Sequence, residues 1–401
     1  MSKIQTEKRH DTLPEAASSA QKYYNTGLAC FGLSGICAIS AGVIVSLIRD
    51  RYGFSYGLTG TMISTMSIGN MAALFFAGIL PVKLGEKRTT LLMCSGYSIG
   101  YLLMGITGNP LLLMTAFLAA GIAKGCTANK CTVLVGNYTV DRARGMSVMN
   151  AYFAAGALLC PLLISAAGYL GRVFPDSVML QPISIAAAGL VMWLALAHAG
   201  LPDSVFPGQQ KKSGGTNDFF RNPVFWIMTF LLFCENGAEY SVNGWMVTYY
   251  KNEHILSASL SSYAVTIQWA AMLIGRLLIA YVIRIRDMFK FLTAMGAAIS
   301  LIYCVLVSVH SPAAAVIALA LFSLAISGLY PLAVAGIGEM TTSESVGVML
   351  SIAGFGGILF PWIIGMVADR FGLRIGMAVN LLPCVGTLVM SLLMCRRRRQ
   401  E

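Results

Sequence analysis

Residues 178–200 read VMLQPISIAAAGLVMWLALAHAG and contain no Asp, Glu, Lys or Arg. A helix needs about 20 apolar residues to cross the hydrocarbon core of a bilayer, so this stretch predicts a membrane-spanning helix. The next stretch, 201–222, reads LPDSVFPGQQKKSGGTNDFFRN and is rich in polar residues, glycine and proline. It predicts a flexible linker at the middle of the chain.

Working outward from this boundary, eleven more segments have the length and apolar character of a membrane span. They are 24–48, 57–82, 90–108, 110–138, 144–170, 223–250, 257–283, 288–309, 312–338, 345–368 and 373–395. Only α-helices satisfy every backbone polar group within single segments of this length. We therefore expect an all-α polytopic membrane protein with twelve transmembrane helices in two pseudo-symmetric six-helix bundles.

The predicted domains follow from these segments and from the polar break. They are an N-terminal tail at 1–22, a six-helix bundle at 23–200, a linker at 201–222, a second six-helix bundle at 223–395 and a basic tail at 396–401. The first 22 residues lack the apolar core of a signal peptide, so the first apolar segment is expected to be an uncleaved span.

The composition supports membrane insertion. The chain of 401 residues is 57% hydrophobic and 11% charged, whereas soluble domains have about 25% charged residues. A soluble enzyme and a nucleic-acid-binding domain are thereby excluded, and the expected partners are the lipid bilayer and a small-molecule substrate, with no nucleic acid. We expect a monomer.

The net charge of +11 comes from Lys and Arg residues that gather in alternate connections between the predicted spans. Because cytoplasmic loops are enriched in Lys and Arg, this pattern predicts that both termini are cytoplasmic. We expect a multi-pass protein of the plasma membrane, in bacteria the cytoplasmic membrane.

A short repeat relates the two halves. Residues 156–161 read GALLCP and residues 356–361 read GGILFP, so a glycine and a proline recur after 200 residues. The loop residues Gly78, Lys83, Gly85, Lys87 and Arg88 resemble the loop motif of the major facilitators, although Val82 stands where that motif has an acidic residue. The resemblance implies two parallel halves and alternating access.

The C-terminal half resembles a narrower branch, the fucose–proton symporters and sugar permeases. The matching stretches are Glu235–Tyr240, Gln268–Trp269, Gly275–Leu278, Gly328–Pro331 and Asp369–Gly372. The resemblance implies ion-coupled transport of a sugar or sugar derivative. One departure is that spans one to six carry no acidic residue away from their ends, and the fourth span carries Lys124.

Charged residues inside the spans are the first candidates for function, because a charge at the bilayer centre costs on the order of 2.5–3.5 kcal/mol. Glu235 and Glu239 are four residues apart and share a helix face. Two such carboxylates repel one another when both are ionised, which favours the uptake of a proton by one of them. We expect both to take part in ion coupling, with a proton or sodium as the coupling ion and with no other cofactor and no metal.

The candidate substrate-binding residues combine charge, amides and aromatic rings, as a carbohydrate site requires. They are Lys124, Asn129, Glu239, Asn243, Gln268, Trp269, Tyr152 and Trp245. Lys124 is expected either to pair with Glu239 or to bind an anionic group of the substrate. The candidate gating residues are Arg276, Lys83, Arg88 and Pro361, the last because a proline within a span removes a helical hydrogen bond.

These features favour a secondary active transporter that moves a small polar solute, most simply a sugar or sugar derivative, by ion-coupled alternating access. Three alternatives remain open at this point: an organic-anion carrier that uses Lys124, a drug efflux pump and a non-transporting membrane sensor. The sequence has neither a nucleotide-binding P-loop nor a catalytic motif, so an enzyme is not expected.

Overall fold

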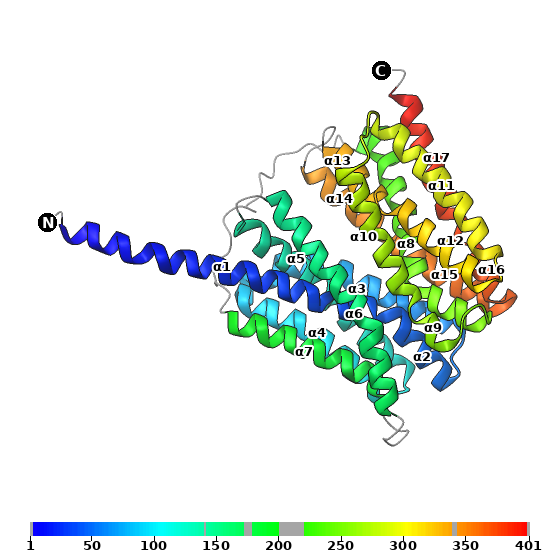
Figure 1. Ribbon diagram of the computed structural model, residues 1–401, viewed down its shortest axis with the longest axis horizontal. Coiled ribbons are helices and arrows are strands. Elements are labelled where there is room, and N and C mark those ends of the chain that lie inside the picture. The colour runs from blue at the N-terminus through cyan, green and yellow to red at the C-terminus, as the bar shows by residue number, and fades with distance from the viewer. Residues whose placement is uncertain (1–2, 140–141, 172–178, 200–219, 339–342, 399–401) are drawn as a thin grey trace.

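The computed structural model describes residues 3–139, 142–171, 179–199, 220–338 and 343–398 (Figure 1). Within these ranges the chain forms seventeen helices and no β-strand. The all-α prediction is therefore confirmed. The predicted linker at 201–222 lies outside the described residues except for 220–222.

The N-terminal half contains seven helices. They are α1 (Lys3–Ile39), α2 (Ala41–Tyr52), α3 (Tyr56–Leu84), α4 (Glu86–Ile106), α5 (Pro110–Asn137), α6 (Arg142–Leu170) and α7 (Leu180–Ala199). Helices α1 and α2 together form the first span. Helix α1 already begins at Lys3, so it includes most of the tail predicted at 1–22 (Figure 1).

The C-terminal half contains ten helices, several of them separated by short breaks within one span. They are α8 (Pro223–Asn252), α9 (Ala258–Ser261), α10 (Ala264–Tyr281), α11 (Met288–Ser308), α12 (Pro312–Ile326), α13 (Leu329–Gly338), α14 (Ser343–Gly354), α15 (Gly356–Phe371), α16 (Leu373–Ala378) and α17 (Leu381–Arg397). The pairs α9–α10, α12–α13, α14–α15 and α16–α17 each make one span.

Ten helical stretches of the described chain have the length and hydropathy of a membrane span. Helices α3 and α8 have 29 and 30 residues and, at about 1.5 Å per residue, are also long enough to cross. Together they give the twelve predicted spans. Because the number is even, α1 begins and α17 ends on the same side of the membrane, which we call the terminal side; the other side is the distal side.

The same local signal starts a span in each half. Asn109 precedes Pro110, and its side-chain oxygen accepts hydrogen bonds from the backbone N–H groups of Leu111 and Leu112. Asn222 precedes Pro223 and accepts from the backbone N–H of Val224 in the same way. Asparagine caps the free N–H groups of the first turn, and proline needs no hydrogen bond there.

Glycines let neighbouring spans approach closely. A Cβ atom at Gly121 of α5 would lie 2.0 Å from the carbonyl oxygen of Met66 on α3, and one at Gly69 of α3 would lie 2.2 Å from the carbonyl oxygen of Leu118 on α5. Small residues at such crossings allow backbone-to-backbone packing inside a membrane. The two helices are therefore held in one register.

We expect Gly121→Val to destabilise the N-terminal bundle by about 1–3 kcal/mol, because the added side chain must push α3 and α5 apart. The measurement is the melting temperature of the purified protein in detergent. Gly171→Ala is the control, since a Cβ atom there would lie 3.9 Å from its nearest neighbour, Leu180. Equal melting temperatures for the two variants would contradict the packing argument.

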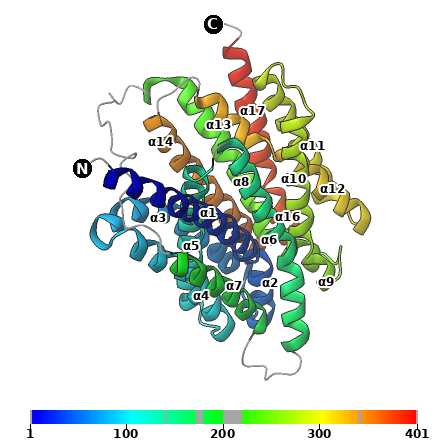
Figure 2. The same cartoon turned by 60° about the vertical axis from the view of Figure 1, so that its left-hand side comes forward.

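The two halves lie side by side in both views, with α1–α7 on one side and α8–α17 on the other (Figures 1 and 2). The contacts between the halves run mainly along α3 with α15, α2 with α8, and α6 with α10. The site described next lies between these three pairs of helices.

Candidate functional site

Two adjoining cavities lie between the halves. The inner cavity has a volume of about 160 Å³, and the outer cavity has a volume of about 740 Å³. The two share five lining residues, Asn70, Lys124, Phe153, Tyr240 and Trp269. These residues come from α3, α5, α6, α8 and α10, so the cavity is built by both halves.

Lys124 and Glu239 place opposite charges in the wall of the inner cavity. The Lys124 Nζ atom lies 4.8 Å from the centre of the Tyr240 ring, a cation–π contact. Among the described residues, no carboxylate oxygen lies within 4.0 Å of this ammonium group. Glu239 is close enough to act on Lys124 electrostatically, so the two residues face one another without forming a direct ion pair.

An amide and two aromatic rings complete this wall. The indole Nε1 of Trp269 donates a hydrogen bond to Asn243 Oδ1 at 3.1 Å. The Trp269 ring packs against Phe153, with ring centres 5.2 Å apart. These contacts join α8, α10 and α6, and all three residues line the inner cavity.

Glu235 lies one turn from Glu239 and is fully buried. Among the described residues, neither of its oxygens makes a hydrogen bond of good geometry. The groups that act on it are the nearby carboxyl of Glu239 and the guanidinium of Arg276. Arg276 lines the outer cavity and donates from Nε to the carbonyl oxygen of Ser327, 3.3 Å away, at the break between α12 and α13. Buried polar atoms without partners are rare in proteins and often mark a functional site.

The structure brings together only part of the set expected from the sequence. Lys124, Glu239, Asn243 and Trp269 line the inner cavity, and Arg276 lines the outer one. The cavity linings do not include Asn129, Gln268, Tyr152 or Trp245.

These four residues occupy different surroundings. Tyr152 is 47% exposed, and Asn129 is half-buried. Gln268 is fully buried, and neither of its amide atoms has a hydrogen-bond partner among the described residues. Trp245 is fully buried and donates from Nε1 to the carbonyl oxygen of Pro361, 2.9 Å away. Trp245 and Pro361 thus lie in the contact between α8 and α15.

The expected gating residues Lys83 and Arg88 are exposed at the turn between α3 and α4. In the same turn Glu86 forms an ion pair with Lys130 of α5. Sequence reasoning gave Lys130 no part in the site, and this pairing agrees with a structural role.

Of the five residues that both cavities share, three were not among the expected site residues: Phe153, Asn70 and Tyr240. Phe153 follows Tyr152 directly, and a step of one residue turns a helix by about 100°, so the neighbour of a predicted residue faces the cavity instead.

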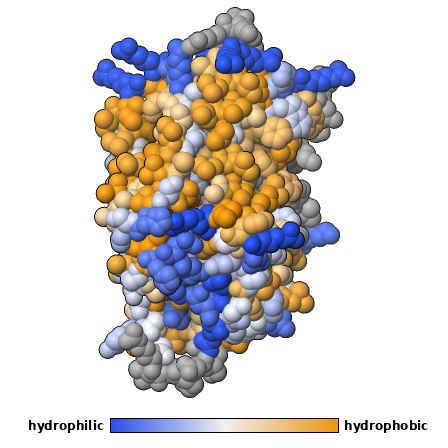
Figure 3. All heavy atoms as spheres, turned by 90° about the vertical axis from the view of Figure 1, so that its right-hand side faces the viewer, coloured by the Kyte–Doolittle hydropathy of each residue, from blue (hydrophilic) through white to orange (hydrophobic). Residues whose placement is uncertain are grey.

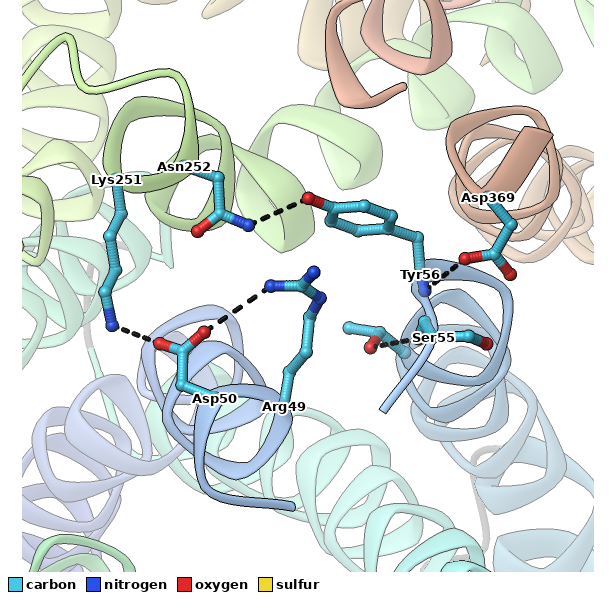
Figure 4. A network of polar contacts seen from close by, with 8 residues as sticks. Arg49, Asp50, Ser55, Tyr56, Lys251, Asn252 and Asp369 are labelled. Atoms are coloured by element: carbon cyan, nitrogen blue, oxygen red, sulfur yellow. Dashed lines mark hydrogen bonds and ion pairs between the residues drawn. The ribbon is translucent and has the colours of Figure 1, made fainter. Parts of the chain in front are cut away.

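The distal side is closed by a polar network that we call the distal latch: Arg49, Asp50, Tyr56, Lys251, Asn252 and Asp369 (Figure 4). Asp369, at the end of α15, accepts hydrogen bonds from the backbone N–H groups of Tyr56 at 2.6 Å and of Gly57 at 2.7 Å. These N–H groups belong to the first turn of α3, where a helix favours a negative charge. One carboxylate of the C-terminal half thereby caps a helix of the N-terminal half.

The rest of the latch continues across the two halves. Asp50 forms ion pairs with Lys251 and with Arg49, the latter at 3.4 Å. The Arg49 guanidinium lies 3.9 Å from the centre of the Tyr56 ring. The Tyr56 hydroxyl accepts a hydrogen bond from Asn252 Nδ2 at 3.0 Å.

Below the latch, glycines and main-chain carbonyls bring the halves into contact. A Cβ atom at Gly60 would lie 2.9 Å from the carbonyl oxygen of Pro361, and one at Gly42 would lie 2.4 Å from that of Asn243. Ser64 Oγ donates to the carbonyl oxygen of Ile358 at 2.6 Å. The inner cavity lies beneath this closed seam, and the outer cavity extends from it toward Arg276 and Tyr330.

A central cavity between two six-helix bundles, closed toward one side of the membrane, defines a membrane transporter rather than an enzyme. The model of the Major Facilitator Superfamily matches residues 27–353, and the chain belongs to this family.

The proteins that are similar over nearly the whole chain include two curated relatives and a solved structure. An uncharacterised MFS-type transporter of Yersinia pestis is 24% identical, with 92% of this chain and 93% of the relative covered. The glucose/mannose transporter GlcP of Bacillus subtilis is 22% identical, with 89% and 90% covered.

The solved structure is that of a bacterial homologue of the human lysosomal transporter Spinster, in an inward-facing and occupied conformation. It superposes with a TM-score of 0.75 at 14% identity and covers 93% of this chain and 96% of that one. At this identity the likeness concerns the fold.

Proposed function

We propose that this transporter moves a sugar or sugar derivative across the membrane by ion-coupled alternating access. The observation that carries the proposal is the inner cavity, where Lys124 and Glu239 face one another without direct contact beside the amide of Asn243 and the ring of Trp269. Hydroxyl groups need amide and carboxylate partners, and the apolar face of a sugar ring needs an aromatic surface. The similarity to a glucose/mannose transporter supports this substrate class.

The coupling ion in this proposal is a proton carried by Glu239 and Glu235. Glu239 lines the inner cavity. Glu235 lies one turn behind, facing Glu239, Arg276, Tyr240 and Tyr330. A proton on this pair removes a charge that the closed cavity would otherwise have to bury, so loading and closure are linked.

A second candidate substrate is a sugar acid or another small carboxylate. It is favoured by Lys124, a half-buried cavity residue for whose ammonium group the described residues provide no carboxylate within 4.0 Å. A carboxylate on the substrate would supply that missing partner through a charge-assisted hydrogen bond.

Thermal-shift measurements with neutral sugars, sugar acids and amino sugars test the substrate class, because a ligand that binds the folded state stabilises it. If the substrate carries a carboxylate, Lys124→Gln is expected to weaken its binding about tenfold, equivalent to roughly 1.4 kcal/mol. Uptake into proteoliposomes with an imposed pH or sodium gradient tests transport of the ligand found.

Lys130→Gln is the matched control, because Lys130 lies on the same helix and is paired with Glu86 outside the cavity. It is expected to lower the melting temperature and to leave the affinity unchanged. Equal losses of affinity in the two variants would contradict a role for Lys124 in binding, and stabilisation by neutral sugars alone would reject the acidic substrate.

We propose that the transporter is a monomer in the plasma membrane and that its terminal side faces the cytoplasm. The Lys and Arg residues of the connections on that side support this orientation. The outer cavity would then open inward, as in the inward-facing Spinster homologue with the same fold.

A further inference from the structure

A separate cavity of about 490 Å³ lies on the terminal side of the C-terminal half and shares no lining residue with the two central cavities. It is formed by residues 285–290, at the connection from α10 to α11, together with Cys395 and Arg398 at the end of α17. Helices α11 and α17 pack against one another. The cavity therefore sits where two spans emerge from the membrane.

The cavity has an unbalanced positive charge. Its single carboxylate, Asp287, accepts a hydrogen bond from the backbone N–H of Lys290 at 3.1 Å and forms an ion pair with the Lys290 ammonium group at 3.0 Å. The backbone and side-chain hydrogen bonds from Lys290 lower the pKa of Asp287, which stays ionised at neutral pH. Its charge is thus already matched by Lys290 and by the start of α11.

Arg286 and Arg398 remain as cations for which the described residues provide no acidic partner. Neither is in an ion pair with any carboxylate of the described chain. The Arg398 guanidinium lies 5.2 Å from the centre of the Phe289 ring. Stacking holds this planar group beside the cavity and leaves its N–H groups at the edge free for an anion.

The surroundings are those of a lipid contact. Val282 and Ile283 are 68% and 40% exposed just before the cavity, and Leu392 and Leu393 are 39% and 42% exposed just before the end of α17. On this face of the molecule, a band of hydrophobic residues lies below hydrophilic residues gathered at the end where α17 ends (Figure 3). A ligand here meets apolar side chains on one side and arginines on the other.

We propose that this cavity binds the phosphate headgroup of an anionic phospholipid, with the acyl chains lying along the exposed apolar residues at the end of α10 and on α17. Arg286 and Arg398 would hold the phosphate, since a guanidinium binds phosphate oxygens through paired hydrogen bonds. Basic pockets between spans on the cytoplasmic side are a known setting for anionic headgroups. A phospholipid fits better than free phosphate because the apolar surface continues directly from the cavity.

The test is the binding of phosphatidylglycerol to the full chain in a neutral detergent, followed by native mass spectrometry and by thermal shift. We expect phosphatidylglycerol to bind and raise the melting temperature more than phosphatidylcholine does. Each basic residue near an anionic surface contributes about fivefold in affinity, so Arg286→Gln with Arg398→Gln should weaken binding about 25-fold. The double variant Arg286→Lys with Arg398→Lys keeps the charge but loses the paired hydrogen bonds and the stacking on Phe289, so it should bind more tightly than the double glutamine variant and more weakly than the unmodified chain.

Arg221→Gln is the control, because Arg221 is an exposed cation on the same side of the membrane and is outside the cavity. It should bind phosphatidylglycerol as the unmodified chain does. Inorganic phosphate is the second arm: stabilisation by phosphate without retention of phosphatidylglycerol would overturn the lipid proposal. Equal binding of both lipids, or unchanged binding in the double glutamine variant, would overturn it as well.

Discussion

Glu239→Gln is expected to abolish gradient-driven accumulation of the solute in proteoliposomes. One pH unit corresponds to 1.36 kcal/mol per proton, so a gradient of two units can support about 100-fold accumulation when one proton moves with each solute. Glutamine keeps the shape and hydrogen-bonding capacity of Glu239 but cannot carry a proton. The accumulation ratio should therefore fall from as much as about 100 to about one, because the solute then equilibrates without coupling.

Exchange of labelled for unlabelled solute across the same vesicles separates coupling from folding and binding. We expect Glu239→Gln to retain exchange, since exchange needs the cavity to open on both sides but needs no net proton transfer. Glu239→Asp, which keeps a carboxyl group, should retain part of the accumulation. Accumulation by Glu239→Gln at the level of the unmodified chain would show that coupling through Glu239 is wrong.

Asp369→Asn is expected to shift the transporter about tenfold toward conformations in which the distal side is open. The Asp369 carboxylate accepts two hydrogen bonds from the first turn of α3, at 2.6 and 2.7 Å. Because these bonds join the two halves, they form only while the halves are closed on the distal side. Charge-assisted bonds at a helix N-terminus are worth about 2 kcal/mol together when partly exposed to water. Asparagine has one acceptor oxygen and no charge, so most of this energy is lost.

The shift can be measured as a distance distribution between spin labels on the two halves. Labels at Arg51→Cys and His254→Cys flank the latch on residues that are exposed, in a background where the exposed Cys304 is replaced by serine. Arg370→Gln changes the neighbouring exposed residue and should leave the distribution unchanged. A distribution for Asp369→Asn that matches that of Arg370→Gln would contradict the capping argument.

The fold could be predicted because membrane spans are a property of short, continuous stretches. The apolar run at 178–200 predicts a membrane-spanning helix from its length and hydropathy alone, and so does each of the eleven other segments. The sequence did not reveal that α1 continues through the polar tail from Lys3. It also did not reveal the breaks that divide several spans into two helices.

The candidate site could be predicted in part. Charge within an apolar span identified Lys124 and Glu239, and the four-residue step identified Asn243. The rotation of a helix about its axis was harder to infer, because packing sets it and composition does not. For that reason Tyr152 was favoured although its neighbour Phe153 faces the cavity.

The distal latch could not be predicted from local patterns. Asp369 and Tyr56 are 313 residues apart in the chain, and Asp369 follows the end of its span, where an acidic residue ordinarily faces water. Only the packing of α15 along α3 brings its carboxylate to the start of α3. The acceptor in this contact is the Asp369 side chain, but the donors are backbone N–H groups. Because every residue other than proline has such a group, no residue type identifies these donors in the sequence.

The residues of the distal latch are absent from the lining of both central cavities. Selection can therefore act on the choice of cargo and on the balance between open and closed forms independently. A library of variants confined to the cavity wall would explore new cargoes on an unaltered gate. Changes confined to the latch would tune how long each form lasts while the cargo stays the same.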